Sequence, residues 1–199
     1  MAAIIAFDVN ETLLDLAALG PLFARIFGDL TVRREWFAQM LESMFDSLVT
    51  DHYAVSPPSR WARTAFAARH DVAVSQDNRR QIREGMQHLP PHPDVRLALK
   101  GLRGTGLRLV TLTNSPEPVA RVQIANAGLG DLFEVVLSAD SVRRLKPAPE
   151  PYRMVAEQGS VPIGQVRLVA AHGPVAERPD IVGDTLGEVA ERIIVVDQT

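Results

Sequence analysis

The sequence predicts an α/β protein with a parallel-sheet core domain and an inserted all-helical cap domain. Apolar runs typical of buried strands alternate with helical segments through residues 91–199, which favours a parallel sheet. A further apolar run stands at residues 4–7, whereas residues 15–90 show helical patterns and no strand signal. We therefore expect a Rossmann-like core domain of residues 1–14 and 91–199, and a helical cap domain of residues 15–90.

The first predicted strand ends in a group of polar side chains. Residues 4–7 are apolar without alternation, as in a parallel strand that is covered on both faces. Asp8 follows at the carboxyl end of this strand, where open α/β sheets place their chemistry. A carboxylate there is a candidate nucleophile that can form an ester intermediate; alternatively, Asp8 caps a turn or pairs with a lysine. Asn10, Glu11 and Thr12 add further hydrogen-bonding groups, which are costly near a buried strand unless they are partnered.

The helical block contains three predicted helices, which span residues 31–48, 59–69 and 77–88. In the first of them, Trp36 and Met40 recur at helical spacing. We expect the apolar side chains of this block mainly to form the core of a helix bundle. Some of them could also form an apolar roof over a site.

The α/β pattern resumes after a proline-rich boundary at residues 89–93. Strands that alternate with helices imply a parallel sheet with right-handed crossovers. The first strand belongs to this sheet, so the helical block is an insertion, and a cleft is expected between core and cap. The expected helices span residues 94–102, 116–127 and 149–158, and the expected strands span residues 107–113, 133–138, 166–171 and 193–196.

Two further strand ends carry polar groups that suit an anion. Thr113, Asn114 and Ser115 precede a predicted helix, so their side chains and backbone N–H groups could form an anion-binding nest. An ordinary helix N-cap would explain Ser115 but not all three residues. Lys146, which is followed by proline, could balance the charge of Asp8 and bind an anionic substrate; alone, it would be a surface lysine.

A histidine follows the strand predicted at residues 166–171. His172 could be a general base for water, oriented by the carboxylate of Glu11. The alternative is a core histidine whose hydrogen bonds are all made within the protein and which has no role in catalysis.

The composition argues against several classes of protein. A net charge of −3 over 199 residues gives no reason to expect a nucleic acid or a membrane surface as partner. The absence of cysteine excludes disulfides, thiolate chemistry and a cysteine metal site. No apolar run approaches the ~20 residues that span a bilayer, and the N-terminus lacks the pattern of a signal peptide. We therefore expect a soluble cytoplasmic protein.

Taken in order, these motifs resemble the haloacid dehalogenase superfamily, and within it the type II L-2-haloacid dehalogenases. The resemblance rests on residues 8–12, the helical insertion, residues 113–115 and the Lys146–Pro147 pair. Phosphatase members of the superfamily carry a second Asp two residues after the nucleophile, where this chain has Asn10. The combination of His172 with Glu11 resembles a subgroup in which a His–Glu dyad activates the hydrolytic water.

The resemblance implies an (S)-2-haloacid dehalogenase-type hydrolase that converts short 2-haloacids to 2-hydroxyacids through an aspartyl ester. It implies no metal and no other cofactor, a haloacid and a halide as ligands, and no nucleic acid or membrane; the apolar cap helices would allow a homodimer. The implied catalytic residues are Asp8, Glu11, Lys146 and His172. The implied substrate-binding residues are Val9, Asn10, Thr113, Asn114, Ser115, Trp36 and Gln39, with Thr12 in a supporting role.

The sequence departs from this family in two places. Relatives hold the leaving halide with a cap arginine, for which Arg33 and Arg34 are the candidates here. The segment between Gly173 and Arg178 is shorter than the resemblance implies, and a rival interpretation makes residues 181–185 the fourth motif, with an acidic metal ligand. The alternatives are therefore a magnesium-dependent phosphatase of the same superfamily, a catalytically impaired homologue, and a non-catalytic domain that binds a partner.

Overall fold

The computed structural model describes residues 3–49, 65–171, 181 and 183–198. The chain divides into two compact units, one of Met1–Asp15 with Pro90–Thr199 and one of Leu16–Leu89. We call them the α/β unit and the helical unit. Among the described residues, no helix has both the length and the hydropathy that crossing a membrane requires.

The α/β unit is built on a parallel four-stranded sheet in the order β3-β2-β1-β4. In the central pairings, Ile4 lies opposite Arg108 of β2 and Val166 of β4. All four residues of β1 are fully buried, as expected of a strand that is covered on both faces. The strands are β1 Ile4–Phe7, β2 Arg108–Thr113, β3 Val135–Ser138 and β4 Val166–Val169.

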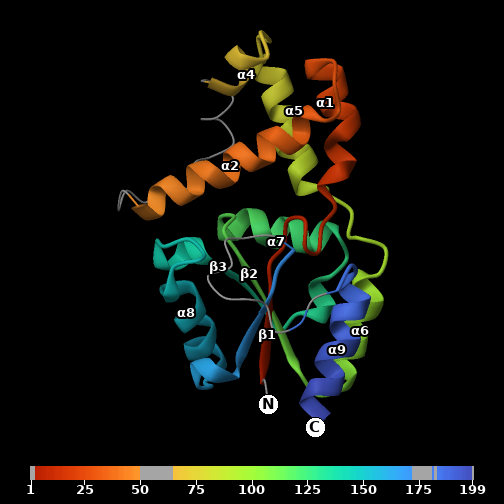
Figure 1. Ribbon diagram of the computed structural model, residues 1–199, viewed down its shortest axis with the longest axis vertical. Coiled ribbons are helices and arrows are strands. Elements are labelled where there is room, and N and C mark those ends of the chain that lie inside the picture. The colour runs from red at the N-terminus through yellow and green to blue at the C-terminus, as the bar shows by residue number, and fades with distance from the viewer. Residues whose placement is uncertain (1–2, 50–64, 172–180, 182, 199) are drawn as a thin grey trace. The chain divides into compact units, whose positions relative to one another are not determined.

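Helices cover both faces of this sheet, with α8 on one side and α6 and α9 together on the other (Figure 1). On the α8 side, Met154 and Val155 pack with Ile4, Val110 and Leu112 in one apolar cluster. The helices of this unit are α6 Val95–Gly104, α7 Glu117–Asn126, α8 Pro149–Gly159 and α9 Leu186–Gln198, and its 3-10 turns are Gly130–Leu132, Ala139–Val142 and Ile163–Gln165. This is the α/β fold class that the sequence predicts.

The strand predicted at residues 193–196 is wrong, because these residues lie inside α9. Ala190 and Ile193 are buried at helical spacing, whereas Val195 is 64% exposed. The run of branched residues therefore presents one apolar stripe, which packs beside α6. A short apolar run fits a strand and a half-buried helix equally well, and here packing against α6 decides for the helix.

The helical unit has a core of aromatic side chains. Phe23 lies 5.1 Å from Trp36 between ring centroids, and Phe27 lies 5.6 Å from Phe66. Its elements are the 3-10 turn Leu16–Leu19 and the helices α1 Gly20–Phe27, α2 Val32–Val49, α4 Ala65–Arg69 and α5 Gln76–Gln87. Of the helix predicted at residues 59–69, the part before residue 65 lies outside the described residues.

Candidate active site

Asp8 lies at the carboxyl end of β1, on the side of β4. Its backbone N–H donates to the carbonyl oxygen of Val169 over 2.9 Å. Because β1 pairs with β2 on one side and with β4 on the other, Asp8 sits where the order of the strands reverses. In open α/β sheets this position opens the crevice in which ligands bind.

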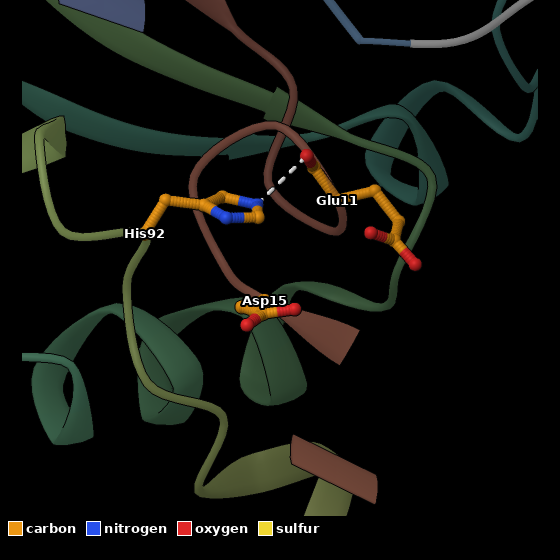
Figure 2. A group of neighbouring side chains, drawn as sticks. All are labelled: Glu11, Asp15 and His92. Atoms are coloured by element: carbon orange, nitrogen blue, oxygen red, sulfur yellow. Dashed lines mark hydrogen bonds between the residues drawn. The ribbon is translucent and has the colours of Figure 1, made fainter. Parts of the chain in front are cut away.

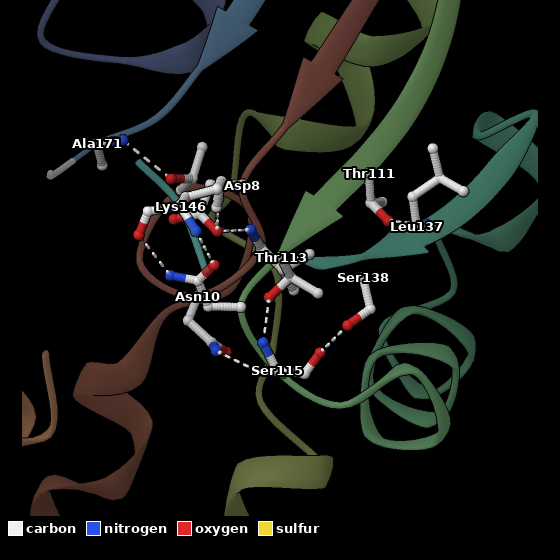
Figure 3. A network of polar contacts seen from close by, with 12 residues as sticks. Asp8, Asn10, Thr111, Thr113, Ser115, Leu137, Ser138, Lys146 and Ala171 are labelled. Atoms are coloured by element: carbon white, nitrogen blue, oxygen red, sulfur yellow. Dashed lines mark hydrogen bonds and ion pairs between the residues drawn. The ribbon is translucent and has the colours of Figure 1, made fainter. Parts of the chain in front are cut away.

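Lys146 forms an ion pair with Asp8 (Figure 3). Nζ of Lys146 lies 2.8 Å from Oδ1 of Asp8, and only 10% and 15% of the two side chains are exposed. The backbone N–H of Val9 donates to the same oxygen over 2.9 Å. Among the residues that the structure describes, no hydrogen bond or ion pair reaches Oδ2. Oδ1 is therefore held in place, whereas Oδ2 is available for chemistry.

Asn114 fixes the backbone that presents Lys146. Its Oδ1 accepts from the Lys146 backbone N–H over 2.8 Å, and its Nδ2 donates to the Lys146 carbonyl over 3.3 Å. The Lys146–Pro147 peptide bond is cis. In this structure the Asn114 amide thus binds the main chain of Lys146, which positions the lysine beside Asp8.

Thr113 and Ser115 form a second polar group at the end of β2. The backbone N–H of Ser115 donates to Oγ1 of Thr113 over 3.1 Å, and the carbonyl oxygen of Ser115 accepts from Oγ of Ser138 over 2.6 Å (Figure 3). The N–H of Ser115 is therefore already satisfied within the protein. Of the nest expected from the sequence, the Asn114 amide binds the Lys146 backbone, and Oγ of Ser115 accepts from the side chain of Asn10.

Asn10 joins this group through its side-chain amide. Its Nδ2 donates to Oγ of Ser115 over 3.2 Å, and its Oδ1 accepts from Nε2 of Gln123 over 3.0 Å. Asn10 is 9% exposed and Gln123 is fully buried. Gln123 lies on α7, and the sequence analysis did not identify it, because a single polar residue on a helix carries no sign of what it contacts.

The loop after Asp8 is tied to the end of β4. Oγ1 of Thr12 accepts from the backbone N–H of Ala171 over 2.9 Å. Glu11 takes a positive φ of 63°, a conformation that costs non-glycine residues roughly 1 kcal/mol or more. Its backbone N–H donates to the carbonyl oxygen of Leu14 over 2.8 Å. The turn therefore holds a carboxylate where glycine would be the least strained residue.

Glu11, Asp15 and His92 form the one side-chain group among the described residues that could hold a metal ion. One ligand atom from each lies within 4.8 Å of the others, and all three side chains are half-buried (Figure 2). Nε2 of His92 lies 3.0 Å from the backbone carbonyl oxygen of Glu11. Asp8 is not a member of this group, and Asp184, the acidic residue of the rival fourth motif, is exposed just before α9.

Tyr152 is a further residue of the site that the sequence analysis missed. Burial raises the pKa of its phenol above the ordinary value of 10.0, and the negative charge of Asp8 raises that pKa further. Tyr152 lies in the first turn of α8, shortly after Lys146. The sequence did carry a signal for Tyr152: it is an aromatic residue in the first turn of the helix that follows Lys146. That turn starts at the edge of the sheet that carries Asp8.

The remaining predicted site residues fall in other parts of the chain. His172 lies outside the described residues, and the chain is described up to Ala171 just before it. In the helical unit, Trp36 is 1% exposed within the aromatic core, and Gln39 is half-buried on α2. Of the two candidate halide ligands, Arg33 is buried and Arg34 is exposed.

The fold and this site define an α/β protein with a candidate nucleophilic carboxylate at the crevice of its sheet, and comparison with known proteins gives the family. The model of the haloacid dehalogenase-like hydrolases matches residues 2–166. The chain belongs to this family.

Individual relatives are distant but consistent in fold. The (S)-2-haloacid dehalogenase H-109 of Pseudomonas putida is 23% identical over 172 residues, which are 84% of this chain and 76% of that protein. The structure of an L-2-haloacid dehalogenase from Xanthobacter autotrophicus with covalently bound chloropropionic acid matches with a TM-score of 0.84, at 20% identity, over 98% of this chain and 99% of that one. A phosphoglycolate phosphatase of Cupriavidus necator is 38% identical over 77 residues, but these cover only 39% of this chain and 33% of that protein.

Proposed function

We propose that this protein hydrolyses short 2-haloacids to 2-hydroxyacids through an ester on Asp8. The geometry of the Asp8 carboxylate carries the proposal: Lys146 and the Val9 N–H hold Oδ1, while Oδ2 is left for attack. A carboxylate that a lysine holds in place at the crevice of the sheet is suited to nucleophilic catalysis. The dehalogenases among the relatives, one of them with chloropropionic acid covalently bound, support the same chemistry.

The reaction has two steps. Oδ2 of Asp8 attacks C2 of the haloacid, the carbon–halogen bond breaks, and the halide leaves with the bonding electron pair, with inversion at C2. Water then attacks the Asp8 carboxyl carbon and gives one proton to a general base. The ester bond to the carboxyl carbon breaks, and the departing C2 oxygen takes up the remaining proton of the water. This restores the Asp8 carboxylate and releases the 2-hydroxyacid, and the base returns its proton to solvent. Lys146 balances the carboxylate charge before attack and after hydrolysis.

We propose His172 as the base for the second step, oriented by the carboxylate of Glu11. The strained backbone of Glu11 supports its part in this pair, since residues held at positive φ cluster at functional sites. Base catalysis is typically worth about 10²–10⁴-fold in rate. Loss of His172 should therefore leave the first step intact and slow the hydrolysis of the ester.

We propose that the reaction needs no metal ion. Phosphatase members of the superfamily carry a second Asp two residues after the nucleophile, which serves as general acid and neighbour of the metal. Here Asn10 stands at that position, and its only side-chain oxygen accepts from Gln123. Oδ1 of Asp8 is occupied by the lysine ammonium group. Among the residues that the structure describes, the side chains that contact Asp8 therefore do not fit a divalent cation.

The helical unit is proposed to serve as the cap domain of the enzyme. Its position in the chain, between β1 and α6, is that of an insertion into the α/β unit. Trp36, Gln39 and Arg33 remain predictions for substrate and halide contacts. Replacing Arg33 or Gln39 with leucine should raise the KM for 2-chloropropionate and change the melting temperature little. If the role of the residue is purely structural, the melting temperature should fall and the KM should change little.

Single turnover in ¹⁸O-water tests the proposed reaction. With enzyme in excess over 2-chloropropionate, the account predicts chloride release and ¹⁸O in the Asp8 carboxylate, with unlabelled oxygen in the first-turnover product. Asp8→Asn, which keeps the size of the side chain, should release no chloride. Label in the product and not in Asp8 would mean that water attacks C2 directly.

The same preparation also decides between the proposed function and its alternatives. Magnesium-dependent release of phosphate from phosphoglycolate, without halide release from any haloacid, would establish the phosphatase, which the partial match to the Cupriavidus necator enzyme favours. If the protein releases neither halide nor phosphate, the remaining alternative is a non-catalytic domain that binds a partner.

A further inference from the structure

Gln123 is a buried polar residue that the proposed reaction does not use. Its side chain is fully buried on α7, between the buried apolar residues Ala120 and Ile124. A buried amide is costly unless it is hydrogen-bonded. Nε2 of Gln123 donates to Oδ1 of Asn10 over 3.0 Å, so this glutamine is directed at the loop that follows the nucleophile.

With the Gln123 amide in the orientation that the structure shows, this contact sets the orientation of the Asn10 amide. An amide has two protons on its nitrogen and only acceptor sites on its oxygen. If the Asn10 amide were flipped, its NH₂ group would face the NH₂ group of Gln123. The orientation with Oδ1 towards Gln123 therefore places Nδ2 at Ser115, where it donates to Oγ over 3.2 Å (Figure 3).

This chain of hydrogen bonds leaves two donors for a ligand, one on Asn10 and one on Ser115. Asn10 uses one Nδ2 proton on Ser115, and Ser115 Oγ accepts that proton and keeps its own O–H. Among the residues that the structure describes, no acceptor is found for the second Asn10 proton or for the Ser115 hydroxyl proton. Two adjacent donors, one of them on the residue two positions after Asp8, suit an anionic ligand with two oxygens.

We propose that Gln123 is a positioning residue that sets the direction of the Gln123–Asn10–Ser115 hydrogen bonds, so that Asn10 and Ser115 together donate to the carboxylate of the substrate. The site then favours acids over the corresponding amides, because an amide NH₂ would meet donors instead of acceptors. This inference rests on the proposed function only in taking the carboxylate of a 2-haloacid as the anion.

Binding of an unreactive acid tests the inference independently of catalysis. Propionate carries the carboxylate but no halogen, and propionamide is its neutral analogue. By calorimetry, the wild-type protein should bind propionate more tightly than propionamide. Gln123→Met keeps the size of the side chain but removes the donor, so the Asn10 amide is free to flip. Propionate binding should then weaken about tenfold or more, because a hydrogen bond to the charged carboxylate is lost. Propionamide binding should change much less.

A second variant gives a signature that a merely structural role would not produce. In Gln123→Glu, the protonated acid can still donate to Asn10, whereas the ionised acid can only accept and reverses the amide. The Kd for propionate should therefore rise with pH in Gln123→Glu and show no such step in the wild type. In the Asn10→Ala background, Gln123→Met should have little further effect, because Gln123 acts through Asn10.

The matched control is Gln158→Met, which makes the same exchange at an exposed position of α8 and should bind propionate as the wild type does. The inference is overturned if the wild-type protein does not bind propionate, or if folded Gln123→Met binds acid and amide with unchanged affinities. It is also overturned if both affinities fall equally. If propionate binds as expected but no haloacid releases halide, the proposed function fails and the anion site stands.

Discussion

At Glu11, the backbone and the proposed chemistry make opposite demands. A positive φ of 63° favours glycine, whereas activation of water by His172 requires the carboxylate. Glu11→Gly and Glu11→Ala both remove the carboxylate, and only the glycine variant relieves the backbone. The glycine variant should be more stable than the alanine variant by about 1 kcal/mol, as measured by urea unfolding.

Both Glu11 variants should hydrolyse 2-chloropropionate more slowly than the wild type and accumulate the ester. Equal stability of the two variants would show that the backbone conformation carries no strain. Wild-type turnover in either variant would remove Glu11 from the mechanism.

Tyr152 reports the charge of Asp8. Burial and the Asp8 carboxylate both raise the pKa of the Tyr152 phenol, because each disfavours the phenolate. Asp8→Asn removes the negative charge and leaves the burial. The pKa of Tyr152 should therefore fall in this variant, while remaining above the ordinary value of 10.0.

Tyrosinate absorbance during an alkaline titration measures this pKa. The chain has two tyrosines, so a Tyr53→Phe background leaves Tyr152 as the single titrating phenol. Glu157→Gln, which removes an exposed charge from the same helix, is the control and should leave the pKa unchanged. A pKa that does not respond to Asp8→Asn would mean that the two side chains lie too far apart to interact.

The sequence identifies residues that stand at strand ends, but not residues that reach the site from helices. Asp8, Asn114 and Ser115 could be predicted because buried runs mark where strands stop, and parallel strands end at one edge of the sheet. Lys146 lies beyond β3 and the 3-10 turn Ala139–Val142, and was predicted from the proline that follows it and the charge that it could offer to Asp8. Gln123 and Tyr152 could not, because the approach of a helical side chain depends on how the helix packs. The role of Asn114 shows the same limit: its presence at the site was predicted, whereas its two bonds to the Lys146 backbone were not.

Among the elements, the packing of α8 against β1 depends on the absence of a side chain at Gly159. A Cβ atom there would overlap Cδ1 of Ile4, which is fully buried. Gly159→Ala should destabilise the protein by about 1–3 kcal/mol, as overpacking of a core does.

The control is Gly101→Ala on α6, where an added Cβ meets nothing within 4 Å. This exchange should stabilise the protein by roughly 0.5–1 kcal/mol, because alanine is the better helix former. Thermal and urea unfolding of the two variants measure both effects. A Gly159→Ala protein as stable as the wild type would contradict the packing described for α8.

The elements themselves were predictable where an apolar run had a distinct length and context. The strands at β1, β2 and β3 are bounded by turns and separated by helices, so their type was clear. The type of element at residues 193–196 was not clear from the sequence. An apolar run of this length fits a strand or a helix, and no turn separates it from the residues before it. Contact with α6, distant in the sequence, decides its conformation.

At the scale of the whole molecule, the chain leaves and re-enters the α/β unit at adjacent points. The Asp15 backbone N–H donates to the carbonyl oxygen of Pro90 over 2.9 Å, and Leu14 pairs with Pro91 in an isolated bridge. The helical unit is therefore an insertion that a short linker can replace, because domains with adjacent ends tolerate such changes.

Replacing residues 16–89 with a short glycine–serine linker should leave an α/β unit that unfolds cooperatively, with mixed α/β circular dichroism. The deletion protein should lose turnover of 2-chloropropionate, because the proposed cap is absent. A deletion protein without cooperative unfolding would mean that the α/β unit depends on the helical unit for its stability, and unchanged turnover would remove the helical unit from the reaction.

The ester on Asp8 is the centre of the account, and trapping it tests that claim most directly. In the His172→Ala protein, the first step should proceed and the second should stall. After incubation with 2-chloropropionate, peptide mass spectrometry should find the segment that contains Asp8 heavier by one propionate group, with one chloride released per protein molecule. An unmodified Asp8 peptide in a protein that still releases chloride would contradict the account.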